Sequence, residues 1–260
     1  MKKIFNCVKG SFHELKVLLR SAPSLLVGLF FVSVVGMNLL ANKSINTGVD
    51  WLALDAGILL SWMIFMCMDI ITKRYGPKAA NMVSIMGLLV NLLMALIFFL
   101  ASIIPGVWSA SYVEGSENII NHAFDGTFAG TWFIILGSSI AFIVSAFINN
   151  FLNYLIGKSI KKNPNGFLAF ALRSYVSTFI GQFIDNFLFA LIVSLHFFGW
   201  SILQCVTCAL TGAILELLFE IIFSPLGYKI CRSLEKDNQE DAYLKLIAAK
   251  KEELTHESAN

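Results

Sequence analysis

Charged residues are scarce in this chain: Asp, Glu, Lys and Arg make up 14% of its 260 residues, whereas soluble domains carry about 25%. Hydrophobic residues make up 57%, and the mean hydropathy is +0.74. A soluble domain needs more polar surface than this composition supplies, so the sequence indicates an integral membrane protein.

Motifs of soluble enzymes are also lacking. The chain has no phosphate-binding glycine loop, no His-Glu-x-x-His and no Gly-x-Ser-x-Gly. None of its four histidines lies deep in an apolar stretch with Ser or Cys on the same face. The close pair Cys205 and Cys208 has no companion pair, so we interpret it as two small apolar residues rather than a redox or metal site. We therefore expect no enzymatic activity, no cofactor and no metal.

Six long apolar stretches are present, each close to or beyond the roughly 20 residues that a helix needs to cross a membrane. They are Ser24–Leu40, Trp51–Ile71, Ala79–Ile104, Thr131–Ile156, Phe167–Phe198 and Ser201–Tyr228. This pattern predicts an all-α integral membrane protein with six transmembrane helices. Three spans in each half would place any two repeats in inverted orientation, although the sequence shows no convincing repeat.

The rest of the chain divides around these spans. Residues 1–20 have helically spaced apolar side chains between lysines, which predicts an amphipathic helix on the cytoplasmic membrane surface. Residues 21–232 are expected to form a six-span transmembrane domain, and residues 233–260 a charged cytoplasmic tail. Residues 105–130 are expected to be a long, solvated outer loop.

The positive charges are segregated. Eighteen of the 19 Lys and Arg residues fall in residues 2–20, 73–78, 158–173 and 229–251, which alternate with the outer loops, and only Lys43 lies on the other side. The positive-inside rule then places both termini in the cytoplasm. We expect a multi-pass protein of the plasma (inner) membrane, in contact with lipid. Scattered along one membrane face, these cations do not predict nucleic-acid binding.

Four acids lie within the apolar stretches: Asp69, Asp185, Glu216 and Glu220. A charge at the bilayer centre costs about 2.5–3.5 kcal/mol on insertion scales, so such residues usually face a cavity or a partner. Asp69 has an alternative interpretation as a helix-end carboxylate paired with the neighbouring Lys73 and Arg74. Asp55 lies nearer the outer end of the same span.

Asp185 ends a polar stripe. Ser174, Thr178, Gly181, Gln182 and Asp185 follow 4-3-4 spacing and therefore share one helix face. Lipid cannot satisfy such a face. Hydrogen bonding between helices is one explanation, but the deep carboxylate favours a lined cavity.

Glu216 and Glu220 are one helical turn apart, and no Lys or Arg lies in the core of any span. Arg173, at the mouth of span five, is the nearest cation. The pair is explained either by one neutral acid bonded within the bundle or by a cation that is not part of the protein. We expect one of the two acids to be protonated when no cation is bound and to couple to transport.

Amides extend this polar interior and favour a flat, nitrogen-rich ligand such as a purine-like base. We predict contacts with this substrate by Asn38, Asn42, Asn91, Asn149, Gln182, Asp185, Asn186, Glu216 and Glu220. We predict gating or charge-compensating roles for Asp69, Arg74 and Arg173.

Four segments resemble one known family. They are Asn38-Leu-Leu-Ala-Asn42-Lys43, Asp69-Ile-Ile-Thr-Lys-Arg-Tyr75-Gly76, Arg173-Ser-x-x-Ser177-x-x-x-Gly181-Gln182-x-x-Asp185 and Glu220-x-x-x-x-Pro225-Leu-x-Tyr228. Together they resemble the queuosine-precursor transporter family, also called the VUT (vitamin uptake transporter) family. The resemblance implies six spans and uptake of 7-deazaguanine bases, the precursors of the modified tRNA nucleoside queuosine.

The chain departs from the family pattern at two charged positions. Many members carry Glu in place of Lys73, and a Lys is expected near the position of Glu216. An acid in place of that Lys favours the cationic 7-aminomethyl precursor over the neutral 7-cyano form.

The sequence therefore predicts uptake of a purine-like molecule by alternating access. Two alternatives stay open: the substrate-binding subunit of an energy-coupling-factor importer, and a structural or assembly protein of the membrane. A homodimer or coupling subunits are further candidate partners.

Overall fold

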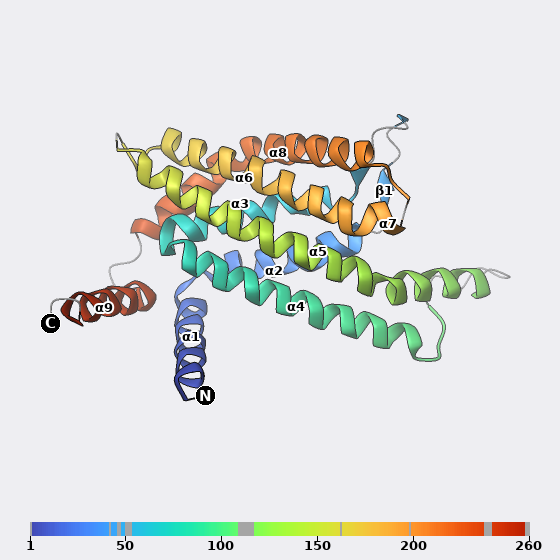
Figure 1. Cartoon of the computed structure of the whole chain (residues 1–260), viewed down its shortest axis with the longest axis horizontal. Coiled ribbons are helices and arrows are strands. Elements are labelled where there is room, and N and C mark those ends of the chain that lie inside the picture. The colour runs from blue at the N-terminus through green and yellow to red at the C-terminus, as the bar shows by residue number, and fades with distance from the viewer. Residues whose placement is uncertain are drawn as a thin grey trace.

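The computed structural model describes residues 2–41, 43–45, 48–49, 54–108, 117–161, 163–197, 199–236 and 241–257. Each of the six predicted stretches contributes a long helix to one bundle (Figure 1). These helices are α2 (Ser24–Leu40), α3 (Ile58–Tyr75), α4 (Pro77–Ile103), α5 (Glu117–Ser159), α6 (Phe167–Phe189) and α8 (Ile202–Lys236). The chain is thus a helical membrane protein, as predicted from its composition.

Four helices of the described chain are long and apolar enough to cross a membrane: α4, α5, α6 with its continuation to Ser194, and α8. A fifth candidate is the pair α1 (Lys2–Ser21) and α2, which is bent by 110°. α3 has 18 residues and carries Asp69, Lys73 and Arg74. Six membrane crossings therefore stay a prediction, although α3 lies inside the bundle.

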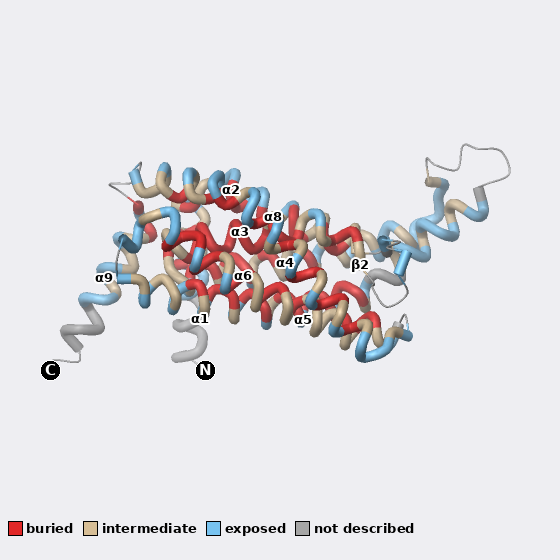
Figure 2. The backbone as a smooth tube through the Cα atoms, turned by 90° about the horizontal axis from the view of Figure 1, so that it is seen from above, coloured by how far each residue is buried: buried red, intermediate tan, exposed pale blue. Residues whose placement is uncertain are grey.

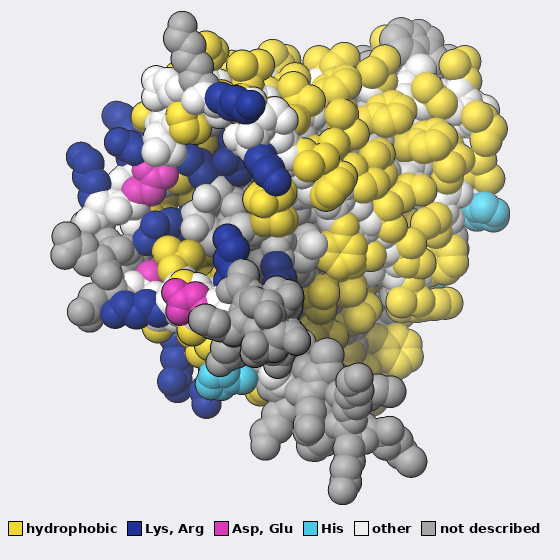
Figure 3. All heavy atoms as spheres, turned by 60° about the vertical axis from the view of Figure 1, so that its left-hand side comes forward, with side chains coloured by type: hydrophobic (Ala, Val, Ile, Leu, Met, Phe, Trp, Pro, Cys, Tyr) yellow, Lys and Arg dark blue, Asp and Glu magenta, His cyan; other side chains and the backbone are white. Residues whose placement is uncertain are grey.

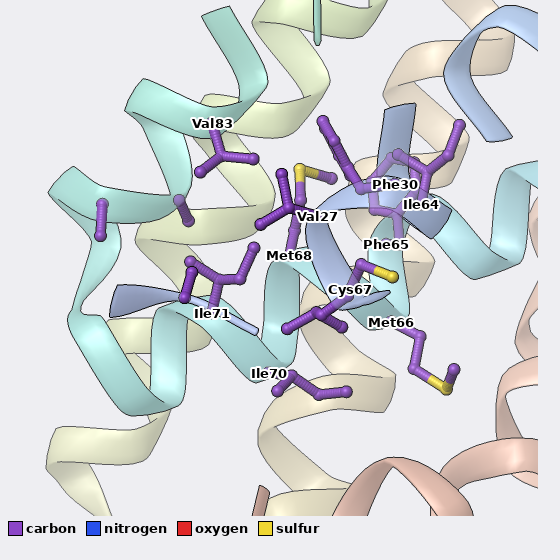
Figure 4. Close-up of a cluster of buried hydrophobic side chains, with 14 of the residues drawn as sticks. Val27, Phe30, Ile64, Phe65, Met66, Cys67, Met68, Ile70, Ile71 and Val83 are labelled. Atoms are coloured by element: carbon purple, nitrogen blue, oxygen red, sulfur yellow. The ribbon is translucent and has the colours of Figure 1, made fainter. Parts of the chain in front are cut away.

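α3 supplies the centre of the hydrophobic core. Ile64, Phe65 and Ile71 are almost completely buried, and they cluster with Phe30 of α2 and Val83 of α4 (Figure 4). Buried residues follow the interior of the bundle from end to end (Figure 2). The outer faces of the helices are apolar and exposed, as a protein surrounded by lipid requires.

The chain reverses tightly between α3 and α4. Gly76 has φ +89°, a conformation that residues with a Cβ rarely adopt. Pro77 follows as the first residue of α4, where its missing N–H breaks no helical hydrogen bond. At the other end of the bundle, the short strands β1 (Ser44–Ile45) and β2 (Leu54–Asp55) pair antiparallel between α2 and α3.

The prediction of a loop over residues 105–130 is wrong for its second half, because α5 begins at Glu117. Trp108 stacks on Phe124 and Phe128 of α5, at centroid distances of 5.4 and 5.1 Å. Its indole N–H donates to Asp125 at 2.8 Å. These contacts hold the start of α5 against the chain that leaves α4.

α6 continues into a π-helical turn, η2 (Ala190–Ser194), and then into α7 (Leu195–Phe197). π-helical turns are rare and often occur at functional sites. This turn follows directly on the part of α6 that lines the cavity described below.

The N-terminal helix α1 and the C-terminal helix lie at the same end of the bundle (Figure 1). The predicted tail spans residues 233–260. Its first residues form the last turn of α8, and a later part forms α9 (Ala242–Glu257). Tyr243 of α9 is 1% exposed, and its backbone N–H donates to the Ser21 hydroxyl at 3.1 Å. Lys and Arg side chains gather at this end, beside a broad hydrophobic surface (Figure 3).

Glu14 joins α1, α4 and α9 in this region. Its carboxylate is buried and lies 2.7 Å from Lys78 Nζ and 2.8 Å from Lys250 Nζ. Burial alone would raise the pKa of Glu14, but the hydrogen bonds from Lys250 and Lys78 outweigh burial and hold the pKa below its ordinary value of 4.5. The ion pairs therefore contribute stability above pH 4.5 and lose it as the pH falls through the lowered pKa.

We expect Glu14→Gln to lower the stability of the protein at pH 7 by about 1 kcal/mol, because both lysines are partly solvated. The difference from the wild type should disappear as the pH falls below the lowered pKa of Glu14. Thermal unfolding at pH 7 and at acidic pH measures both effects, with Lys245→Gln, a charge change on the exposed face of α9, as the control. A difference that persists unchanged at acidic pH contradicts the role of the ionised carboxylate.

Candidate binding site

A cavity of about 500 Å³, counting the part open to solvent, lies at the end of the bundle away from the termini. α2, α3, α5, α6 and α8 contribute to its walls, and β2 contributes at its rim. The lining polar residues are Asn38, Asp55, Ser61, Ser138, Asp185, Asn186 and Glu216.

Three of the lining residues are acids, and none is Lys or Arg. Asp185 on α6 accepts a hydrogen bond at Oδ1 from the Ser145 hydroxyl of α5, at 2.8 Å. Asp55 on β2 accepts one at Oδ1 from the backbone N–H of Gly57, at 2.7 Å. These donors fix the two carboxyl groups at the cavity wall, so the cavity has an acidic lining.

Glu216 of α8 is held from two sides. The Ser61 hydroxyl of α3 donates to its Oε1, and the Asn186 amide of α6 donates to its Oε2 at 3.3 Å. Gly212, one turn away on α8, makes room for Asn186, because a methyl group at Gly212 would lie 2.6 Å from Asn186 Nδ2. α3, α6 and α8 thus meet at the Glu216 carboxyl group.

A second polar cluster lies outside this cavity. Asp69 of α3 is fully buried, and it accepts hydrogen bonds from Asn149 Nδ2 at 3.1 Å, from the Ser174 hydroxyl, and from the Thr178 hydroxyl at 3.4 Å. Glu220 of α8 lies against the same group and is 1% exposed. The cluster therefore joins α3, α5, α6 and α8.

Asp69 does not pair with the cations that follow it in sequence. Lys73 Nζ lies 3.8 Å from Glu235 and 5.5 Å from the centre of the Phe170 ring. Arg74 lies 3.9 Å from Asp241, next to α9. The alternative interpretation of Asp69 as a helix-end ion pair is therefore wrong.

Arg173 is buried inside the bundle rather than lying at its mouth. Its Nε donates to Asn153 Oδ1 at 2.8 Å, and its guanidinium packs against Gly157 of α5. A methyl group at Gly157 would lie 2.7 Å from Arg173 Nη1, so any larger residue there would force the guanidinium group to shift. Arg173 attracts Asp69 electrostatically, but no hydrogen bond joins them in the described structure.

The predicted contact residues thus fall into separate groups. Asn38, Asp185, Asn186 and Glu216 line the cavity. Asn149, Gln182 and Glu220 are buried and do not line it, and the same holds for Asn91 on α4. Asn42 lies outside the described residues. Of the predicted charge-compensating residues, Asp69 and Arg173 are internal and Arg74 lies at the end near the termini.

Sequence reasoning missed three polar residues of the lining: Asp55, Ser61 and Ser138. Asp55 carried a usable signal, because it is an acid at the outer end of an apolar stretch and a glycine follows two residues later. Ser61 and Ser138 carried none, because serines are common inside membrane bundles as helix-to-helix hydrogen-bond donors.

Comparison with known families identifies one match. Residues 55–230 match the model of a family described as "Putative vitamin uptake transporter". This range runs from β2 to the last part of α8 and contains the cavity acids and the Asp69 cluster. Neither the curated proteins nor the solved structures contain a match to the chain.

Proposed function

Because the chain belongs to the vitamin uptake transporter family, we propose that it imports a queuosine precursor, a 7-deazaguanine base, by alternating access. The observation that carries this proposal is the cavity, whose polar lining combines three carboxylates with two amides and has no Lys or Arg. Such a lining is suited to a ligand with several N–H donors and a positive charge.

The carboxyl group of Asp185 is suited to bind the guanine-like edge of the base. A guanine-like edge presents a ring N–H next to an exocyclic amine, and one carboxylate can accept from both. The Ser145 hydroxyl donates a hydrogen bond to Asp185 Oδ1. This bond orients the carboxylate in the cavity wall. Asn38, which is 3% exposed at the cavity, provides an amide for the carbonyl or ring nitrogens.

Glu216 and Asp55 are suited to bind the substituent at position 7 of the base. Of the two precursors, the 7-aminomethyl form carries an ammonium group and the 7-cyano form is neutral. An ammonium group in this cavity gains from nearby carboxylates that no protein cation offsets. We propose that the cationic precursor is the preferred substrate.

The proposed orientation places both termini in the cytoplasm of a cell whose plasma (inner) membrane the six helices cross. The cationic end of the bundle supports it. In this orientation the cavity opens toward the outside, as the outward-facing state of an importer requires.

Uptake of both radiolabelled precursors tests the function, in cells that cannot make them and in liposomes that contain the purified protein alone. We expect saturable uptake in both systems, with preference for the aminomethyl form. Uptake in cells but not in liposomes indicates a subunit of an importer that needs an ATPase module. If neither precursor is taken up or shifts the unfolding temperature, the chain is not their transporter.

We expect Lys161→Cys and Ile119→Cys to report opposite sides of the membrane. Lys161 follows α5 at the cationic end, and Ile119 is 74% exposed near the outer start of α5. In intact cells, and in a background with Cys7→Ser, an impermeant maleimide should label position 119 only. Permeabilised cells provide the control, in which both positions react. Labelling of position 161 alone in intact cells reverses the orientation.

A further inference from the structure

The Asp69 cluster contains more hydrogen-bond acceptors than donors. Asn149, Ser174 and Thr178 all donate to Asp69. Glu220 lies beside them, yet neither of its carboxyl oxygens has a hydrogen bond of normal geometry in the described structure. An ionised carboxylate without donors is costly to bury, so this group needs either a bound cation or a proton.

Two neutral carbonyl oxygens in this part of the bundle are also unpartnered among the described residues. The amide of Asn149 belongs to the cluster, because its Nδ2 bonds Asp69, and its Oδ1 accepts nothing. Gln182, one turn along α6 from Thr178, has neither amide atom bonded. Both residues are 0% exposed. Buried polar atoms without partners are rare and call for a ligand, an ion or water.

The charges around the cluster do not balance. α3 contributes Asp69 and α8 contributes Glu220, while α5 contributes only amides at this level. α6 contributes Arg173, whose Nε is bonded to Asn153. Two carboxylates and one guanidinium leave a net charge of −1 when both acids are ionised, so one monovalent cation would neutralise the site.

We propose that Asp69, Glu220 and Asn149 form a binding site for one Na⁺ ion, with Gln182 and Thr178 as further oxygen ligands. Carboxylate, carbonyl and hydroxyl oxygens are the ligands that hard cations prefer. The described residues contain no group of three His, Cys, Asp or Glu side chains that could hold a metal ion, and two carboxylates with neutral oxygens suit a monovalent ion. The site is separate from the cavity, whose lining includes none of these five residues.

The test uses the purified protein without any precursor, so that it does not depend on the proposed substrate. Thermal unfolding is measured against NaCl concentration at fixed pH, with choline chloride keeping the ionic strength constant. We expect saturable stabilisation by Na⁺ and not by K⁺. Glu220→Gln and Asp69→Asn should each weaken the apparent Na⁺ affinity by about tenfold or more, because each removes a charged ligand.

Asp125→Asn is the matched control, since it makes the same kind of change at an acid of α5 that bonds Trp108, outside both the cavity and the proposed ion site, and it should keep the wild-type Na⁺ response. In Na⁺-free buffer, Glu220→Gln should unfold at the wild-type temperature or higher, because an amide replaces a carboxylate without donors. This result separates a binding role from a structural one. A wild-type Na⁺ response in Glu220→Gln, or no Na⁺ response in the wild type, overturns the site. Stabilisation that varies with pH alone overturns Na⁺ in favour of a proton shared by the two acids.

Discussion

Replacing Asp185 with Asn should nearly abolish uptake of 7-aminomethyl-7-deazaguanine and leave the protein folded and abundant. Asparagine has the same shape and keeps an oxygen for the Ser145 hydroxyl, but it cannot accept two N–H bonds as a carboxylate does. Losing one partner of a buried, charged hydrogen-bonded pair costs about 2–5 kcal/mol. We therefore expect affinity for the base to fall by about 100-fold.

Radiolabelled uptake, together with direct binding by the purified variant, measures this effect. Asp125→Asn is the matched control, because Asp125 is an acid of α5 that bonds Trp108 outside the cavity. Its uptake should equal that of the wild type. Normal uptake by Asp185→Asn means that the polar stripe of α6 is structural and that the base binds elsewhere.

Replacing Glu216 with Gln should change selectivity rather than abolish transport. Glutamine keeps an acceptor for Ser61, so the junction of α3 and α8 should persist. The variant loses a negative charge in a cavity without protein cations, which weakens attraction for an ammonium group. Affinity for the aminomethyl precursor should fall by about 10- to 100-fold, or about 1.4–2.7 kcal/mol, whereas affinity for the neutral cyano form should stay within about twofold.

Competition between the two precursors, measured in one binding assay, shows this change directly. Glu235→Gln, which alters an acid of α8 at the opposite end of the bundle, should keep the wild-type preference. If Glu216→Gln lowers affinity for both precursors equally, Glu216 contacts the common base and not its substituent. Asp55 then becomes the first candidate for the ammonium group.

Helix periodicity predicted which residues share a face, but it could not predict which neighbours that face meets. Ser174, Thr178 and Asp185 lie on one stripe of α6, as their spacing indicated. The structure divides them, because Ser174 and Thr178 bond Asp69 while Asp185 reaches the cavity. Glu216 and Glu220 are also separated, because Glu216 lines the cavity and Glu220 lies in the Asp69 cluster. Depth along the bundle depends on packing between helices, which local spacing does not encode.

Contacts between distant segments also explain the errors in the predicted element boundaries. The start of α5 depends on Trp108, which bonds and stacks with residues more than ten positions away. The position of α9 depends on Glu14 and Ser21, more than 200 positions earlier. By contrast, the turn at Gly76 and Pro77 depends only on its own residues.

α8 runs unbroken from Ile202 to Lys236, about 52 Å at the rise of an α-helix. Glu216 and Glu220 sit about 6 Å apart along this one rod, and Pro225 lies beyond both of them. Any tilt of α8, or any bend at Pro225, therefore moves the two carboxyl groups as one body. If the cavity and the proposed Na⁺ site are both occupied when α8 moves, the base and the ion move together. We therefore expect one Na⁺ ion to accompany each base in the transport cycle.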